Sequence, residues 1–457
     1  MPDPSPTPLR VAVLADSDTR WKWGALTARR LAPASTVHGY LLWGRATPTE
    51  RQLAEIGAEA DHLREVSAVD FLADLGERAH TDAARAAGKE PFDVLILACV
   101  GGTIQAMLHG LARAWRTADR RPAVVTGYVG VVYEKLPDGL LLRHGADLVL
   151  ANSPYDAARF RAVYDGVRAD SSAVTECALP FLDGRAYDPG PAERGERPFR
   201  VVFAVQPSVP AGRKDRAYLL ERAMEHARRH PEREVVLKLR SKPSEHTTHI
   251  EELPYQRLAE RARGERPSNF RLAYGNMGEI LNETDLLVTV SSTAALESLH
   301  RSVPTALLSD LGIREPLGNH YFIGSGCFAS WDELDAGHLP RPEPAWLAEQ
   351  GVGVPHEGAF AAARARLDAL LERREDGGLP PLTPYYTART APGYLPGVLA
   401  RHGLDVKGEP AAGHQDAPAA EAGMRAASRR LLRRTARGAY RAGVQRVAPL
   451  IRRWGQL

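Results

Sequence analysis

The chain has 457 residues, enough for two or more domains that each bury a core of their own. Hydrophobic residues make up 44% and charged residues 25%, as in a soluble globular protein, and the net charge of +3 gives no general argument for nucleic-acid binding. Three widely spaced cysteines without a Cys-x-x-Cys pair argue against a disulfide framework or a thiolate zinc site and fit a reducing cytoplasm.

The sequence also lacks the usual marks of export and membrane insertion. Residues 1–8 are rich in proline and do not show the basic and then apolar order of a signal peptide. No apolar run reaches the roughly 18 residues that a membrane-spanning helix needs. We therefore expect a cytoplasmic protein.

The first half, residues 9–182, alternates short apolar runs with helical stretches, which predicts a parallel sheet covered by helices. The expected strands are residues 9–14, 37–43, 92–99, 123–128, 147–151 and 174–178. Asp16 and Asp18 follow the first strand, at the end where open α/β sheets bind ligands. An N-cap role explains one of these acids but not the whole polar loop up to Gly24.

A linker and a second half follow. Residues 183–198 combine proline, glycine and charge, the composition of an interdomain linker. The alternation then restarts, which predicts a second doubly wound domain over residues 199–400. Its expected strands are residues 199–205, 234–239, 270–272, 286–290 and 303–308. Polar loops follow three of these strands, after Val205, Leu239 and Val290, and would meet at one edge of a parallel sheet.

The turn formed by Ser291, Ser292 and Thr293 is the most informative of these loops. It separates an apolar strand from a helix, so its hydroxyls lie beside unpaired N–H groups at the positive end of the helix dipole, which suits a phosphate. The cations of the other two loops include Arg213, Arg240 and Lys242. Taken singly, each basic loop is explained by solvation and the serines by helix capping; together they favour a phosphate-bearing ligand.

The tail, residues 417–457, has a different composition. Arginines alternate with leucine, valine, tyrosine and tryptophan, and Glu421 is its only acid. This pattern predicts a basic amphipathic helix on a surface of anionic lipid. A disordered or nucleic-acid-binding tail is the alternative.

Two Rossmann-like halves joined by a linker resemble the GT-B glycosyltransferases, in which two such domains face a cleft. Residues 236–243 and 289–293, with Glu297, also resemble the two signature segments of bacterial polysialyltransferases, capsule polysaccharide transferases and CDP-glycerol glycerophosphotransferase-like enzymes. The resemblance implies that these segments hold the phosphates of a cytidine nucleotide. Those families usually have His-Pro where this chain has Lys242 before a proline, with His246 and His249 just beyond, so Lys242 or one of these histidines would take that phosphate contact.

The chemistry that the resemblance implies is displacement at an anomeric or phosphoryl centre. The departing nucleotide phosphate gains negative charge, which hydroxyls, a helix N-terminus and basic side chains would stabilise, so no metal or other cofactor is expected. Asp16 or Asp18 would be the general base for the acceptor hydroxyl, with Glu134 behind them. Glu297 would form a hydrogen bond with the ribose; the equally favoured alternative is a carboxylate on the surface of the helix.

These features predict an inverting, metal-independent glycosyltransferase that uses a nucleotide-activated sugar or polyol, of the cytidine type, to build a cell-envelope polysaccharide or teichoic-type polymer. Its expected partners are that donor and a polysaccharide or lipid-linked acceptor, with no nucleic acid. The tail would hold the protein on the inner face of the cell membrane. Two alternatives are a non-hydrolysing nucleotide-sugar 2-epimerase, which needs no membrane acceptor, and a non-catalytic nucleotide-binding scaffold in envelope assembly.

Overall fold

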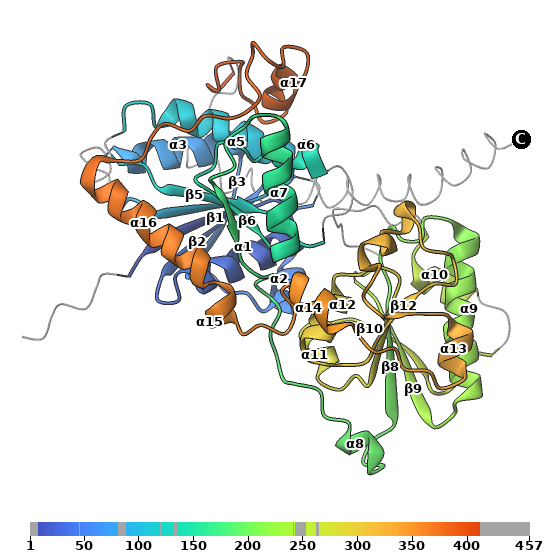
Figure 1. Ribbon diagram of the computed structural model, residues 1–457. Helices are drawn as coiled ribbons and strands as arrows, with labels where there is room; N and C mark the ends of the chain where they lie inside the picture. The colour runs from blue at the N-terminus through green and yellow to red at the C-terminus, as the bar shows by residue number, and fades with distance from the viewer. Residues whose placement is uncertain are drawn as a thin grey trace, which may run out of the picture. The chain divides into compact units, whose positions relative to one another are not determined.

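The computed structural model describes residues 8–44, 46–80, 88–118, 120–131, 136–240, 242, 253–261 and 265–411 (Figure 1). These residues form two compact units. The first unit combines Met1–Asp183 with Pro344–His414, and the second contains Gly184–Glu343. No helix of the described residues is both long and apolar enough to cross a membrane.

The first unit contains a seven-stranded parallel sheet with the strand order β3-β2-β1-β4-β5-β6-β7. The strands are β1 (Arg10–Ala15), β2 (Thr36–Leu42), β3 (His62–Val66), β4 (Val94–Ala98), β5 (Ala123–Gly127), β6 (Leu148–Ala151) and β7 (Val174–Glu176). The helices between them are α1 (Asp18–Leu31), α2 (Glu50–Ile56), α3 (Ala68–Ala79), α5 (Gly101–Ala114), α6 (Leu136–Leu141) and α7 (Pro154–Gly166).

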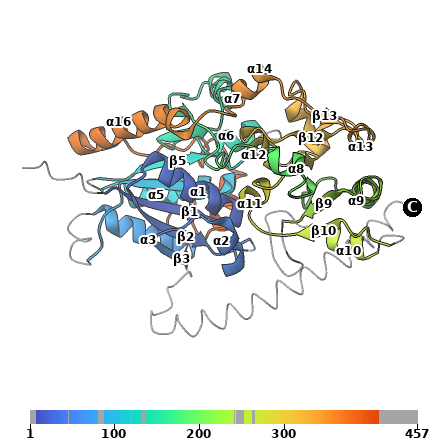
Figure 2. The same ribbon diagram turned by 90° about the horizontal axis from the view of Figure 1, so that it is seen from below.

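Side chains of the first sheet alternate between two faces, and different helices cover each face. Ala12 and Leu14 of β1 pack into the cluster that contains α3, α5 and α7. Val13 faces α1, where Gly24 has so little space that a Cβ atom would lie 2.6 Å from Val13 Cγ1. Figure 2 shows α3 and α16 on opposite faces of this sheet.

The chain returns to the first unit after the second. This segment forms α14 (Pro344–Glu349), α15 (His356–Ala359), α16 (Ala361–Gly377) and α17 (Leu395–Ala400). Helix α16 is held to the first unit by Arg374, whose guanidinium donates to the Asp93 carboxylate (2.9 Å). The expected second domain of residues 199–400 therefore ends early, because residues from Pro344 onward pack on the first sheet instead.

The second unit contains a six-stranded parallel sheet with the order β10-β9-β8-β11-β12-β13. Its strands are β8 (Phe199–Ala204), β9 (Arg233–Lys238), β10 (Phe270–Ala273), β11 (Leu286–Thr289), β12 (Thr305–Leu308) and β13 (Phe328–Ala329). Its helices are α8 (Gly190–Glu193), α9 (Arg213–Arg229), α10 (Tyr255–Glu260), α11 (Met277–Leu281), α12 (Ala294–His300), η1 (Glu315–Leu317), η2 (Asn319–Phe322) and α13 (Trp331–Asp335).

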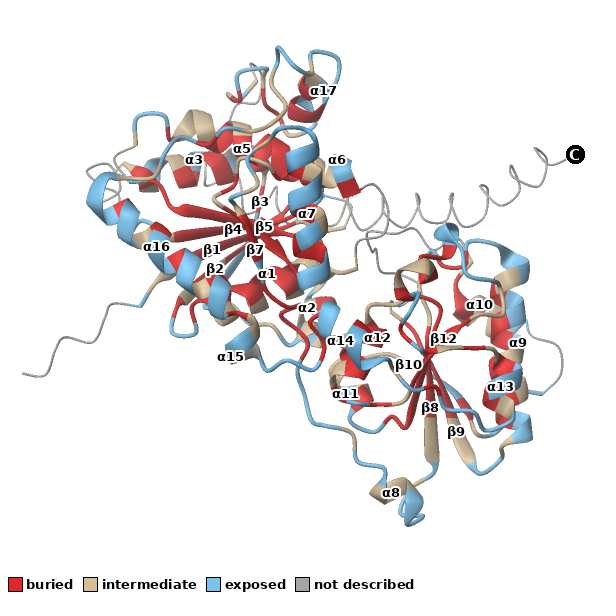
Figure 3. Ribbon diagram, viewed as in Figure 1, coloured by how far each residue is buried: buried red, intermediate tan, exposed pale blue. Residues whose placement is uncertain are grey.

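The second sheet also has a core on each face. Val201 and Phe203 of β8 pack with residues of α9, α10 and α13, whereas Val202 packs on the other face with residues of α11 and α12. The central strands are almost wholly buried (Figure 3). Two doubly wound Rossmann-like sheets thus confirm the expected fold class.

The differences from the expected elements are concentrated in the edge strands of the two sheets and in the helices next to them. Strands β3 and β13 and the adjoining helices α3 and α13 were not among the elements expected from the sequence. Four of the five residues of β3 are exposed, so this edge strand lacks the apolar run that marks a central one. The three cysteines are buried and free, in agreement with the expectation of no disulfide framework.

Candidate functional site

Three neighbouring strands of the second sheet end in register. Lys238 of β9 is aligned with Ala204 of β8, and Ala204 with Thr289 of β11. The loops that begin at residues 205, 239 and 290 therefore leave from one edge, as the sequence analysis expected. This edge carries the predicted serines and is the carboxyl end of a parallel sheet.

Ser291 joins two of these loops. Its backbone N–H donates to Gln206 Oε1 (3.0 Å), and Gln206 Nε2 lies 3.2 Å from its hydroxyl oxygen. The hydroxyl itself lies 2.5 Å from the carbonyl oxygen of Leu317, to which it donates. Because Ser291 is only 3% exposed and has these partners, its side chain holds the edge together rather than facing a ligand directly.

Ser292 and Thr293 are more accessible. Both are half-buried, and the Ser292 hydroxyl accepts from the backbone N–H of Ala294 (3.2 Å). Thr293 is the N-cap residue of α12, and among the described residues its hydroxyl caps no helix N–H. These two hydroxyls are therefore the ones that this turn offers to a bound molecule.

The basic residues of the edge divide into structural and accessible ones. Arg216 is 1% exposed. Its guanidinium donates to the carbonyls of Gln206, Pro207 and Pro210 and lies over the Tyr255 ring, 4.2 Å from its centroid. It therefore fixes the β8–α9 loop. Arg213, at the start of α9, is exposed.

The segment after β9 supplies further cations. Lys238 is 7% exposed, and its ammonium group donates to the carbonyl of Leu239 (2.7 Å). Arg240 is half-buried and Lys242 is exposed, and both have interaction partners. His246 and His249 lie outside the described residues, so the choice between Lys242 and these histidines stays a prediction.

Glu297 lies on α12, one turn beyond the serines, and is 6% exposed. This burial contradicts the alternative of a surface carboxylate, because such a group would be largely hydrated. Its interaction with a ribose stays a prediction.

In the first unit, Asp16 joins β1 to the start of α5. Its Oδ2 accepts from the backbone N–H of Val100 (3.0 Å), and its Oδ1 accepts from Arg20 Nη1 (2.9 Å). Asp18 is the first residue of α1, after the N-cap residue Ser17. Both acids lie just beyond β1, at the predicted position. Glu134 lies outside the described residues, as does the tail from residue 417.

Sequence reasoning missed Gln206 as part of the edge. It follows Ala204 by two residues, just as Ser291 follows Thr289, and Ala204 and Thr289 are partners in adjacent strands. Equal offsets from paired strand ends were the signal that could have identified it. The pairing of β8 with β11, however, is known only from the folded sheet.

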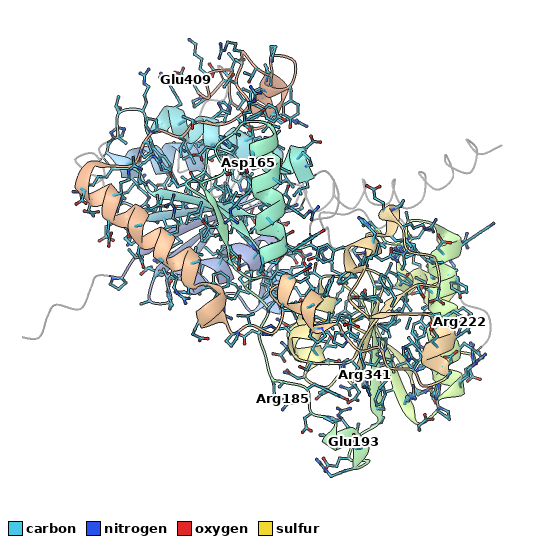
Figure 4. The ribbon with its side chains drawn as sticks, in the orientation of Figure 1. Asp165, Arg185, Glu193, Arg222, Arg341 and Glu409 are labelled. Carbon is cyan, nitrogen blue, oxygen red and sulfur yellow. The ribbon has the colours of Figure 1, made fainter. Side chains whose placement is uncertain are left out.

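A second polar cluster lies on α9 and α13, where His226, His230 and Asp335 offer ligand atoms within 4.8 Å of one another. His226 Nδ1 pairs with Asp335 Oδ1 (2.6 Å), and Arg233 donates to His226 Nε2 (3.3 Å). Arg222, labelled in Figure 4, also donates to Asp335 (2.8 Å). Both ring nitrogens of His226 are engaged, so these side chains form a polar network that joins α9 and α13.

The sequence matches a family model described as "Putative glycosyltransferase (DUF6716)" over residues 11–370. No curated protein matches it. The matched range includes both sheets, so the match concerns the two units together.

The chain is also similar to solved structures. A UDP-glucosyltransferase from Polygonum tinctorium is 12% identical, with a TM-score of 0.50 over 81% of this chain and 99% of that chain. MnaA from S. aureus, solved with UDP, is 10% identical, with a TM-score of 0.49 over 80% and 97% of the two chains. The wall teichoic acid polymerase TagF is 10% identical, with a TM-score of 0.43 over 81% and 90%. At 12% identity the likeness to the UDP-glucosyltransferase concerns the fold alone.

Proposed function

Since the chain belongs to the DUF6716 family of glycosyltransferases, we propose that it transfers a sugar or polyol from a cytidine-type nucleotide donor to a cell-envelope polymer, with inversion and without a metal ion. The second unit binds the donor through the edge at which β8, β9 and β11 end. The first unit supplies the base that activates the acceptor hydroxyl, from the region of Asp16 and Asp18.

One observation supports the donor site more than any other. The strand ends Ala204, Lys238 and Thr289 are aligned, so Ser292, Thr293 and the buried ammonium of Lys238 belong to one edge. Hydroxyls and cations at the carboxyl end of parallel strands suit a phosphate group. Arg213 and Arg240 add positive charge to loops of the same edge, and Gln206 with Ser291 holds two of those loops together.

The same groups serve the chemical step. As the bond between the sugar and the nucleotide phosphate breaks, the leaving oxygen gains negative charge, and fixed donors that face it lower the barrier. Two hydroxyls and nearby cations can do this without a divalent ion. The sequence after residue 198 has no Asp-x-Asp pair of the kind that would carry such an ion.

The cytidine type of the donor is proposed from the sequence segments at residues 236–243 and 289–293. The envelope polymer and the peripheral membrane position are proposed from the same resemblance and from the ten arginines of residues 417–457. Attraction between clustered arginines and anionic lipid supports a location next to a lipid-linked acceptor.

A ligand panel followed by product analysis tests this function. We expect CMP or CDP to raise the melting temperature of the full chain more than UDP or GDP, because a ligand that binds only the folded state stabilises it by mass action. Incubation with the matching activated sugar should then release the free nucleotide. Interconversion of nucleotide sugars would indicate an epimerase, and binding without turnover would indicate a scaffold; either result would contradict the proposal.

A further inference from the structure

Two histidines and one aspartate converge at the end of α9. His226 and His230 are four residues apart, so they lie on the same face of the helix, and their ring centroids are 4.6 Å apart. Asp335 is the last residue of α13, which packs against α9 (Figure 1). One ligand atom of each of the three side chains lies within 4.8 Å of the other two. The fold thus brings three metal-binding side chains together from two helices.

Packing holds this cluster in place. The His226 ring is 0% exposed and its centroid lies 5.6 Å from that of the Trp331 ring. The Asn269 side-chain amide donates to the carbonyls of His230 (3.1 Å) and Arg233 (2.9 Å), which fixes the turn after α9. His230 itself is half-buried, so an ion can reach the cluster from the solvent side.

Three arginines surround the cluster and orient its carboxylate. Arg222 and Arg229 approach Oδ2 of Asp335 (2.8 and 3.5 Å). Oδ1 instead faces His226 Nδ1 at 2.6 Å. Hydrogen-bonded outer groups orient metal-binding carboxylates in the same way. Each arginine is also paired with a second acid: Arg222 with Asp332 (2.9 Å), Arg229 with Glu225 (3.0 Å) and Arg233 with Glu232 (3.5 Å).

We propose that His226, His230 and Asp335 bind a zinc ion that joins α9 to α13. Two imidazole nitrogens and one carboxylate oxygen suit zinc, and water can fill the fourth position of the tetrahedron on the side of His230. The negative partial charge at the C-terminal end of α9 favours a cation there. Tetrahedral zinc holds its ligand atoms about 3.3 Å apart. The 2.6 Å pair of His226 and Asp335 therefore opens slightly, and the wider distances close.

Zinc takes the place of a proton between His226 and Asp335. In the metal-free chain His226 Nδ1 donates to Asp335 Oδ1, and Nε2 accepts from Arg233 (3.3 Å). When zinc binds Nδ1, the single proton of the neutral ring moves to Nε2. Arg233 then turns to the carboxylate of Glu232, with which it is already paired. The ring changes its tautomer and keeps its charge.

The cluster lies away from the proposed donor edge. Helix α9 ends shortly before β9, which begins at Arg233, whereas the donor edge lies at the other end of this strand, at Lys238. A zinc ion bound by the cluster therefore serves the packing of two helices and not the departure of a nucleotide phosphate. This inference does not rest on the proposed glycosyl transfer.

Zinc titration of the full chain, dialysed against a chelator, tests the site. Calorimetry should show one tightly bound Zn²⁺ per chain, and saturating Zn²⁺ should raise the melting temperature, because an ion that binds only the folded state stabilises it. His230→Gln and Asp335→Asn should each weaken binding by more than about 100-fold, since even the outer partners of metal ligands are worth about 10–100-fold. His230 is half-buried, so its variant remains informative if Asp335→Asn does not fold.

His338→Gln is the matched control for histidines that bind zinc on the surface. His338 is exposed and lies three residues beyond Asp335. This variant should bind Zn²⁺ as the wild type does and show the same rise in melting temperature. The His230→Gln variant should show no such rise.

Cobalt gives a readout of the ligands themselves. Co²⁺ in the same site should show the strong visible absorption of tetrahedral coordination, and Zn²⁺ should abolish it by displacing the cobalt. The charge-transfer bands of a cobalt–thiolate bond should not appear, because the proposed ligands are nitrogen and oxygen atoms. Thiolate bands would assign the ion to cysteines and overturn the site.

Two further results would overturn the proposal. One is a metal-free wild type that binds no Zn²⁺. The other is a His230→Gln variant with the affinity of the wild type, which would place the ion elsewhere on the chain. Neither result bears on the proposed transferase, whose failure would show in the nucleotide panel and the product analysis.

Discussion

Ser291 and Ser292 are adjacent residues of the same type with different surroundings. Ser291 is buried and hydrogen-bonded to Gln206 and Leu317, whereas Ser292 and Thr293 are half-buried at the start of α12. Their separate roles follow from the pleat and turn of the backbone, which direct neighbouring side chains to different places. The sequence analysis treated the three hydroxyls as one group of phosphate ligands.

We expect Ser291→Ala to lower the free energy of unfolding by about 1–3 kcal/mol, because it removes the hydroxyl that pairs with Gln206 Nε2 and with the buried Leu317 carbonyl. Ser292→Ala with Thr293→Val should leave stability nearly unchanged and weaken nucleotide binding instead. Urea unfolding and nucleotide titration of both variants distinguish these effects. Equal nucleotide affinity in the Ser292 and Thr293 double variant and the wild type would remove these hydroxyls from the donor site.

Another residue-scale contrast is provided by Gly24. A Cβ atom at this position would lie 2.6 Å from Val13 Cγ1 and 2.9 Å from Ala98 Cβ, so α1 would have to move off the sheet. Gly24→Ala should therefore destabilise the protein by about 1–3 kcal/mol, the usual cost of overpacking a core. Gly377→Ala is the control, because nothing lies within 4 Å of a Cβ atom there. Thermal unfolding that gives similar melting temperatures for both variants would contradict this packing.

At the scale of elements, helices α9 and α13 are joined by the network of His226, Asp335, Arg222 and Arg233. Burial lowers the pKa of His226 to about 4, and Asp335 opposes this effect. The His226 ring is therefore neutral in the folded state near pH 7. It accepts from Arg233 and donates to Asp335, an arrangement that a second proton would disrupt.

This network predicts the pH dependence of stability. Between the ordinary histidine pKa of 6.5 and the folded-state pKa of about 4, the unfolded chain binds a proton at His226 that the folded chain does not. Stability should therefore fall as the pH falls through this window, by up to about 3 kcal/mol from this one group. Urea unfolding of the wild type and of His226→Gln between pH 7 and 4.5 measures this loss of stability. The variant should be less stable at pH 7 and lose less stability at low pH; parallel curves would contradict the assignment.

At the scale of the whole molecule, the chain leaves the first unit at Asp183 and returns to it at Pro344. Helix α16 and the segment that contains α17 cover surfaces of the first sheet and of α5 that are apolar or carry buried polar groups. The returning segment is thus part of the hydrophobic core of the first unit, although it follows the second unit in the sequence.

Two truncations test this arrangement. Removing residues 344–457 should unfold or aggregate the first unit, because it exposes the apolar surface under α16 and α17. Removing only residues 417–457 should leave the melting temperature unchanged and abolish pelleting with anionic vesicles. Circular dichroism and vesicle sedimentation are the measurements. Persistent pelleting of the shorter deletion would contradict the membrane role of the tail.

The two doubly wound sheets could be predicted from local sequence, because apolar runs such as those around Val13 and Val288 are typical of central parallel strands. It also placed Asp16 and the serine turn at strand ends, since that placement follows from local order along the chain.

Only the tertiary structure decided which side chains share a site. Strand order pairs β8 with β11 and so brings Gln206 to Ser291, and the return at Pro344 brings Arg374 to Asp93. The folded structure also shows that Arg216 is buried and fixes a loop, and that Glu297 is buried and does not lie on the surface. Such pairings depend on packing between segments that are distant in the sequence, and local patterns carry no information about which distant segments will meet.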